Sequence, residues 1–422
     1  MASKKSNKRT AKKVAKAAKR HPKAVLAIVI VLVVLIAVGV ILYFKVDKVH
    51  DAVDGLINPK TTTTSVEGDD PSLGGGGGST PPKATTYGDK DLSFHFLELG
   101  NNYTGDSTYI KAGDVDILID AGSRQDSADD IGDYVRNYCT DGTLEFVIAT
   151  HAHQDHIAGF TNTKTRDGIF KQFKCGTIID FARTNATSAV YNNYVAARDE
   201  EVAAGATHYT ALQCAKETDG AKKTYELGEG MSMTILYQKY YEEDASHSEG
   251  KENNYSVCLL FNHGENYYLL TGDLEAEGEA SLVEKNSLPE VQLFKAGHHG
   301  SYTASTDALL SAIKPKIVCV CCCCGAVEYT QNLQNTFPSQ AFVNRVAPYT
   351  DKVYVTTLGT ITYNETKGKY EDTGFGSMNG VITVLSSGGN VTVSCSNNNT
   401  LLKDTEWFKD NRTCPSAWAK SP

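Results

Sequence analysis

Residues 144–156 read Leu-Glu-Phe-Val-Ile-Ala-Thr-His-Ala-His-Gln-Asp-His, and the expected fold is built outward from this stretch. Its first six residues are mostly apolar and predict a short buried strand. The three histidines and the aspartate therefore fall where that strand ends and a loop or helix begins.

The His-x-His-x-Asp-His run places four metal-binding side chains within six residues, namely His151, His153, Asp155 and His156. Neutral imidazoles suit zinc or iron, and the carboxylate adds a hard oxygen ligand. The first two histidines can face one metal ion while Asp155 and His156 reach a second, so the spacing indicates a two-metal site. The alternative is a polar loop that is merely rich in histidine, but loops seldom gather four such groups so closely.

The charge of the chain is distributed unevenly. The formal charge is −9, but residues 1–23 hold ten Lys and Arg and no acidic residue, which leaves −19 on the remaining 399 residues. The overall composition, 22% charged and 41% hydrophobic, is that of an ordinary globular protein. An acidic body disfavours broad, nonspecific attraction to nucleic acid.

The eleven cysteines are odd in number and scattered, which is unlike a disulfide framework, so we expect most of them to be free thiols. Four are consecutive, Cys321–Cys324, and follow the apolar run Ile317–Val320. Side chains of a strand alternate between its faces, so core packing is favoured over a metal cluster. One bridge is predicted, between Cys395 and Cys414.

Residues Ala24–Phe44 are 21 uncharged residues dominated by Val, Ile and Leu, long enough to cross about 30 Å of hydrocarbon as a helix. Lys45 follows directly, without the small-residue cleavage site of a signal peptide, so we expect an uncleaved anchor. The positive charges before it predict a cytoplasmic N-terminus and an extracellular remainder.

Strand and helix patterns alternate along the rest of the chain, which predicts an α/β architecture. Helical spacing occurs at 129–138 and 189–204. Apolar runs predict strands at 92–99, 115–119, 144–149, 233–236, 255–261, 267–270, 291–295, 317–320 and 353–355, and alternating patterns at 360–363, 380–385 and 390–394 predict a β-hairpin annex.

Further motifs appear in a recognisable order around the histidine run: Phe96–Gly100, Gly105–Ser107, Ile117–Gly122, Leu270–Asp273 and Lys295–Ser301. With these motifs, residues 92–363 resemble the metallo-β-lactamase superfamily, and within it the ComEC-type extracellular hydrolase domain. The resemblance implies a four-layer αββα sandwich with its site at one edge of the paired sheets.

Together, the composition and the resemblance predict five segments. They are a basic cytoplasmic tail (1–23), a transmembrane helix (24–44), a juxtamembrane segment with a Thr/Gly/Pro-rich linker (45–90), a metallo-β-lactamase-like hydrolase domain (91–363), and a β-hairpin annex with a C-terminal tail (364–422).

The resemblance also implies roles for residues that would mean little alone. Asp120 and Asp273 each follow an apolar run, where an isolated aspartate is usually a turn residue. By resemblance Asp120 orients the metal-binding loop, and Asp273 bridges two divalent metal ions, zinc or alternatively manganese. One of His298 and His299 is expected to bind metal and the other to contact or protonate the substrate; spacing leaves open which is which.

Two departures from the family pattern stand out. The separate histidine that the superfamily carries before the bridging aspartate has one counterpart by position, His208, but without the usual glycine-rich setting, so a surface histidine is favoured. Relatives also often have Gly-His-Pro after the second histidine pair, whereas this chain has Phe337-Pro338-Ser339. We therefore expect one metal position to be short of a protein ligand.

These observations predict a membrane-anchored, outward-facing binuclear hydrolase. Its metal ions would lower the pKa of a bound water, and Asp155 would orient that water. The resemblance points to a phosphodiester substrate, either DNA or a cell-surface polymer. The alternatives are a lactamase or lactonase on the same scaffold, and a noncatalytic binding module.

The charge contrast across residues 24–44 gives a test of topology. Protease added to intact cells should release a fragment that begins in the linker at residues 58–88, because that segment is expected to be flexible and outside. Immunoblotting of the supernatant checks this. A fragment that stays protected until the membrane is breached would contradict the predicted orientation.

Overall fold

The computed structural model describes residues 87–245 and 252–419. The predicted basic tail, transmembrane helix and nearly all of the linker lie outside these residues. Among the helices that are described, none is both long enough and apolar enough to cross a membrane.

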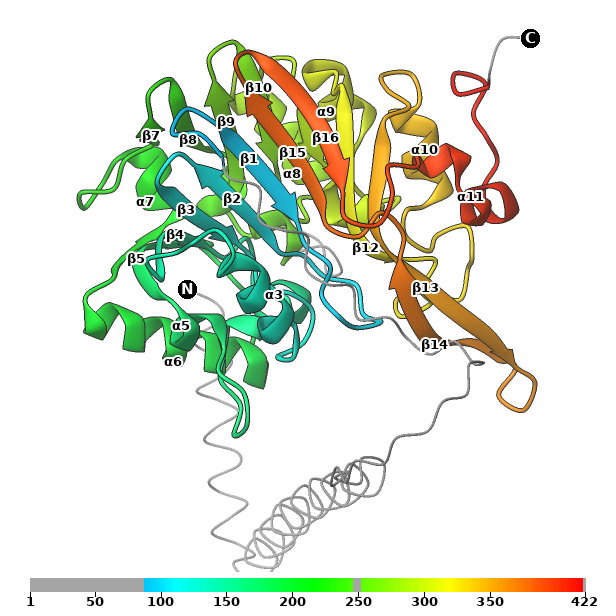
Figure 1. Cartoon of the computed structure of the whole chain (residues 1–422), viewed down its shortest axis with the longest axis horizontal. Coiled ribbons are helices and arrows are strands. Elements are labelled where there is room, and N and C mark those ends of the chain that lie inside the picture. The colour runs from blue at the N-terminus through cyan, green and yellow to red at the C-terminus, as the bar shows by residue number, and fades with distance from the viewer. Residues whose placement is uncertain (1–86, 246–251, 420–422) are drawn as a thin grey trace, which may run out of the picture. The chain divides into compact units, whose positions relative to one another are not determined.

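Within the described ranges the strands form two eight-stranded sheets (Figure 1). The first has the order β16 (Asn390–Cys395), β15 (Ile382–Ser387), β1 (Leu92–Phe96), β2 (Thr108–Ala112), β3 (Val115–Ile119), β4 (Thr143–Ile148), β5 (Lys174–Asp180), β6 (Thr207–Thr210). The second has the order β14 (Lys369–Ser377), β13 (Val353–Asn364), β12 (Ile317–Cys324), β11 (Leu293–Lys295), β10 (Asn266–Leu270), β9 (Cys258–His263), β8 (Met231–Leu236), β7 (Thr224–Gly228).

The two sheets repeat one pattern of strand directions. Strands β1–β3 pair antiparallel and β3–β6 parallel in the first sheet. Strands β7–β10 pair antiparallel and β10–β13 parallel in the second. Each sheet therefore has a set of parallel strands whose carboxyl ends share an edge, where α/β sheets usually place their ligands.

Apolar side chains fill the space between the sheets. The ring of Phe94 on β1 lies 5.3 Å from Phe261 on β9 and 4.8 Å from Tyr268 on β10, centre to centre. All three residues are buried. Contact between rings of both sheets means that the sheets pack face to face.

Helices cover the outer sides of this pair (Figure 1). Buried side chains of α3, α5 and α6 pack with the first sheet, and those of α8, α9, α10 and α11 with the second. This confirms the predicted helix–sheet–sheet–helix layering. The α-helices are α3 (Ser127–Val135), α4 (Gln154–Ile157), α5 (Ile169–Gln172), α6 (Ala189–Ala204), α7 (Ala211–Lys216), α8 (Ala276–Lys285), α9 (Asp307–Ile313), α10 (Gln340–Val346) and α11 (Glu406–Asn411); short 3₁₀ turns are η1 (Ala158–Phe160), η2 (Lys239–Tyr241), η3 (Asn253–Tyr255), η4 (Gly297–Gly300) and η5 (Leu402–Asp404).

Helix α6 shows how local sequence sets the boundaries of an element. The Ser188 hydroxyl accepts a hydrogen bond from the Tyr191 N–H at 3.1 Å and caps the first turn. Gly205 ends the helix at φ 117°, a conformation that costs glycine little. The predicted range 189–204 is confirmed.

The cysteine run lies on β12, and all of its residues are buried. Cys321 joins the core between the sheets, while Cys322 and Cys324 face the helices of the second sheet. The thiols thus pack on opposite sides, as expected of core residues. All eleven cysteines lie in the described ranges as free thiols, so the predicted bridge between Cys395 and Cys414 is wrong.

The C-terminal strands complete both sheets. The predicted boundary at residue 363 falls inside β13, whose antiparallel partner β14 forms one edge of the second sheet. Strand β15 pairs directly with β1, with Phe94 opposite Val384, and β16 follows it at the edge of the first sheet.

Candidate metal centre

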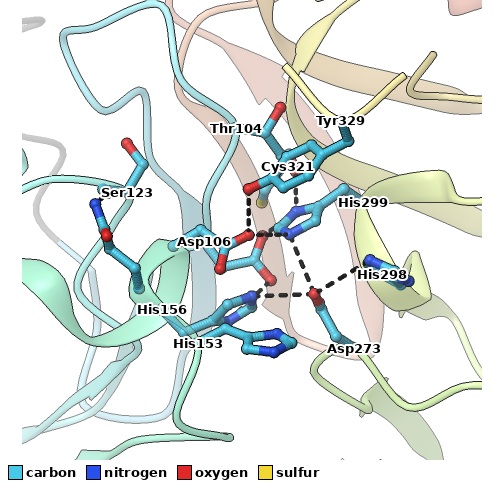
Figure 2. A network of polar contacts seen from close by, with 12 residues as sticks. Thr104, Asp106, Ser123, His153, His156, Asp273, His298, His299, Cys321 and Tyr329 are labelled. Atoms are coloured by element: carbon cyan, nitrogen blue, oxygen red, sulfur yellow. Dashed lines mark hydrogen bonds and ion pairs between the residues drawn. The ribbon is translucent and has the colours of Figure 1, made fainter. Parts of the chain in front are cut away.

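Four strand ends deliver the predicted ligands to one place. Asp120 follows β3 and the histidine run follows β4 in the first sheet, while Asp273 follows β10 and the histidine pair follows β11 in the second. Figure 2 shows His156, Asp273, His298 and His299 pointing toward one another. The centre is therefore built by both halves of the fold.

The histidine run changes direction at His153. Its backbone is extended (φ −72°, ψ 148°) and it caps the short helix α4, which carries Asp155 and His156 on its first turn. The Nε2 atom of His151 lies 3.1 Å from Nδ1 of His153. The rings of His151 and His153 therefore lie side by side at the strand end, 4.8 Å apart from centre to centre.

One carboxylate oxygen of Asp273 lies at the middle of the imidazoles. Its Oδ2 is 3.2 Å from Nε2 of His156 and 3.2 Å from Nε2 of His299. The Nε2 atoms of His151 and His298 are farther away, at 3.9 and 4.0 Å. Asp273 thus contacts histidines from both sheets, as a bridging ligand would.

Buried atoms that have no hydrogen-bond partner indicate that the centre fits a metal ion. They include Nε2 of His156, Nε2 of His299 and Oδ1 of Asp273. With Asp155, these residues offer ligand atoms that all lie within 4.8 Å of one another. Imidazole nitrogens and carboxylate oxygens in this arrangement suit zinc or manganese, and such a cation would satisfy the unpaired atoms.

The charges of these groups depend on one another. Burial acts to raise the pKa of Asp273, but the neighbouring His299 and His156 hold it well below its usual range. Burial acts to lower the pKa of His156, yet Asp273 and Asp120 raise it well above the ordinary value. The carboxylates therefore demand positive charge here, which protons or bound cations can provide.

Asp120 supports the metal-binding loop from behind. Its Oδ1 accepts a hydrogen bond from the Thr150 N–H and its Oδ2 one from the Thr150 hydroxyl, both at 2.8 Å. Its Oδ2 is also 2.7 Å from Nδ1 of His156. A carboxylate on the far nitrogen of a ligand histidine fixes the ring so that Nε2 faces the metal.

A second support was not assigned from the sequence. Asp106, just before β2, lies with Oδ1 3.3 Å from Nδ1 of His299 and contacts the ammonium group of the buried Lys295. Both residues lie in motifs that the sequence analysis quoted without giving them roles. The hydrogen bond of His299 Nδ1 runs to the Cys321 carbonyl oxygen at 2.8 Å, so Asp106 adds charge beside this ring.

The structure separates the roles of the two adjacent histidines. His299 is buried, and its Nε2 lies 3.4 Å from Asp155 Oδ2 in addition to its contact with Asp273. The side chain of His298 is 22% exposed, and its Nδ1 lies near Glu275 (3.1 Å) and Thr303 (2.9 Å). His299 belongs to the buried ligand group, whereas His298 lies at its solvent side.

His208 is not brought to the centre. It pairs through Nε2 with Asp180 at 2.8 Å, beside Arg198, and belongs to none of the potential ligand groups found in the described residues.

Ser256 supports Asp273, although the sequence analysis assigned it no role. Its hydroxyl accepts a hydrogen bond from the Asp273 N–H at 3.1 Å and so fixes the backbone of the candidate bridging residue.

A cavity of about 440 Å³ opens onto the centre. Three of its residues come from parts of the chain that the sequence did not single out: Arg124, Glu328 and Tyr329. Arg124 pairs with Glu328 at 3.0 Å, and the Tyr329 hydroxyl donates to Asp155 Oδ2 at 2.9 Å. The lining residues are Arg124, His153, Gln154, Asp155, Asn253, Glu275, His298, Glu328 and Tyr329.

Metal content should depend on the ligand group. We predict roughly two divalent ions per chain in the full-length protein, and at most one in Asp155→Ala, His156→Ala and Asp273→Ala, measured by inductively coupled plasma mass spectrometry. His208→Ala is the matched control and should keep the wild-type content, because its imidazole pairs with Asp180. Unchanged content in all three ligand variants would show that the assignment is wrong.

Comparison with known proteins agrees with this geometry. The family model of the metallo-β-lactamase superfamily matches residues 100–166. ComE operon protein 3 of Bacillus subtilis (strain 168) is 27% identical over 176 residues, which are 41% of this chain and 19% of that protein. Recombination protein 2 of Haemophilus influenzae is 35% identical over 69 residues, 16% of this chain and 8% of that protein.

The matches therefore span less than a fifth of either relative. Among solved structures, the metallo-β-lactamase fold protein YhfI of Bacillus subtilis aligns at 11% identity and TM-score 0.29, covering 49% of this chain and 70% of that one, too weak a likeness to carry an argument. The sequence matches and the order of the motifs along the chain both indicate similarity to the metallo-β-lactamase superfamily. Residues 100–166 therefore match the metallo-β-lactamase superfamily, and the chain is similar to the ComEC-type relatives named above.

Proposed function

We propose that this chain is a metal-dependent hydrolase that cleaves phosphodiesters outside the cell. The observation that carries the proposal is the position of Asp273, whose carboxylate lies between imidazoles of both sheets while Oδ1 and two Nε2 atoms stay unpaired. Two divalent ions bound there would activate a water and polarise the scissile bond.

The supporting residues have separate tasks in this reaction. Asp120 holds His156, and the Cys321 carbonyl oxygen, 2.8 Å from Nδ1 of His299, holds His299 in the orientation that binding requires. Asp155 lines the cavity and is suited to orient the attacking water. The centre has no need of a serine or cysteine nucleophile, because the water supplies the new bond to phosphorus.

Phosphodiesters are favoured over lactams for two reasons. A pair of cations can stabilise both the entering and the leaving oxygen of an in-line displacement at phosphorus. The cavity also presents polar groups suited to phosphoryl oxygens, among them the amides of Gln154 and Asn253 and the guanidinium of Arg124.

Charge bears on which phosphodiester is cleaved. The formal net charge of −19 on residues 24–422 disfavours the binding of long polyanions. At the cavity, Arg124 is paired with Glu328, and Glu275 adds a further carboxylate. DNA is one candidate substrate, and a cell-surface phosphodiester such as a teichoic-acid substituent is the other, which places less demand on positive charge.

Anchoring to the lipid bilayer through residues 24–44 is part of the proposal. It rests on the uncharged length of that segment and on the ten positive charges before it. Such an anchor would hold the catalytic domain at the outer face of the membrane that it spans, within reach of a cell-surface polymer.

The activity test uses the full chain purified in mild detergent. We expect metal-dependent hydrolysis of bis(p-nitrophenyl) phosphate, lost on chelation, restored by zinc or manganese, and at least about 100-fold slower in Asp273→Ala. Single-stranded DNA should be cleaved slowly, at rates that fall with salt.

Release of p-nitrophenolate and β-lactam opening are followed in parallel by absorbance. Fast, salt-insensitive opening of the lactam without diesterase activity would overturn the proposal. Efficient degradation of DNA would keep the proposed reaction and reject the cell-surface substrate.

A further inference from the structure

Tyr329 reaches the centre from a distant part of the chain. It lies in the connection between β12 and α10, and Figure 2 shows it near His299. Its hydroxyl donates a hydrogen bond to Oδ2 of Asp155 at 2.9 Å. The residue is 54% exposed and lines the cavity beside His153 and His298. A phenol at this position faces both a candidate ligand and the space for a substrate.

Contacts on several sides hold this segment in place. The ring of Tyr329 lies 5.7 Å from that of Phe337, which in turn lies 5.7 Å from the ring of His299. The preceding Glu328 accepts a hydrogen bond from the Thr104 N–H at 3.1 Å and pairs with Arg124. The hydroxyl is therefore positioned by packing.

Two other groups that line the cavity, His298 and Arg124, lie against carboxylates. Nδ1 of His298 lies beside Glu275 and Thr303, and its Nε2 faces Asp273. Arg124 is paired with Glu328. Among the residues that line the cavity, Tyr329 is the side chain with a hydroxyl, and an ordinary tyrosine keeps its proton at neutral pH.

One carboxylate oxygen of Asp155 has two neighbours that compete for it. Its Oδ2 accepts from Tyr329 and also lies 3.4 Å from His299 in the ligand group. A cation bound by this carboxylate would withdraw electron density from the oxygen and weaken the tyrosine hydrogen bond. A phosphoryl oxygen in the cavity, bearing negative charge, would then be the better acceptor.

We propose that Tyr329 is a catalytic residue that donates a hydrogen bond to a non-bridging oxygen of the phosphodiester; this rests on the proposed function. In the reaction a P–O bond forms to the water oxygen and the P–O bond to the leaving group breaks. The leaving oxygen ends with a proton from that water, and Tyr329 keeps its own. The hydrogen bond stabilises the charge on the phosphoryl group in the transition state.

The test compares Tyr329→Phe with wild type on methyl p-nitrophenyl phosphate and on the two enantiomers of its phosphorothioate. We expect kcat on the oxygen substrate to fall about 10- to 100-fold, with metal content unchanged. Sulfur accepts hydrogen bonds poorly. On the enantiomer that places sulfur toward Tyr329, the same substitution should therefore lower kcat by less than about 3-fold.

Tyr302→Phe is the matched control. Tyr302 is 52% exposed and lines a neighbouring cavity instead of the one beside Asp155, so its variant should keep wild-type rates. Equal losses in Tyr329→Phe on the oxygen substrate and both enantiomers of the phosphorothioate, or a fall in its metal content, would overturn the inference by showing that Tyr329 only positions Asp155. If wild type cleaves none of these esters, the proposed function itself fails.

Discussion

A buried carboxylate between two sheets sets the main constraint on this fold. Asp273 is 1% exposed, and an isolated charge at that depth is costly unless opposite charge surrounds it. His156 arrives from the first sheet and His299 from the second, each 3.2 Å from the same oxygen. The ends of β4, β10 and β11 must therefore stay in register across the interface for the centre to exist.

The contacts around Asp273 follow from the need of this buried carboxylate for nearby positive charge. Each of these two histidines has an oxygen partner on its other nitrogen, the Asp120 carboxylate for His156 and the Cys321 carbonyl for His299, with Asp106 nearby. Lys295 offsets the charge of Asp106, and Ser256 fixes the backbone of Asp273. Removing Asp120 or Lys295 would leave a charged group buried without its partner, which is why the centre depends on both layers.

The local part of this arrangement could be predicted from the sequence. The histidine run follows an apolar strand, and the range of α6 is marked by Ser188 and Gly205. The resemblance added Asp273 and the histidine pair, although their spacing alone left open which histidine is buried. The predicted range of α6 is confirmed because its signals are local, whereas the ligand roles of these residues stay predictions.

Long-range contacts were not predicted from the sequence, because no local pattern of residues encodes them. Tyr329 meets Asp155 across 174 positions of chain, and β15 pairs with β1 only because both sheets must be closed at that edge. The pairing of His208 with Asp180 likewise depends on β5, which carries Gly176 and has a weak apolar pattern, and was not predicted. Tertiary packing decides such contacts.

The most direct test of the account is anomalous X-ray diffraction from crystals of the metal-loaded protein, measured at the zinc and manganese absorption edges. The account predicts two anomalous peaks about 3.5–4 Å apart, with the carboxylate of Asp273 between them. A single peak away from Asp273, or two peaks that this carboxylate does not contact, would contradict it.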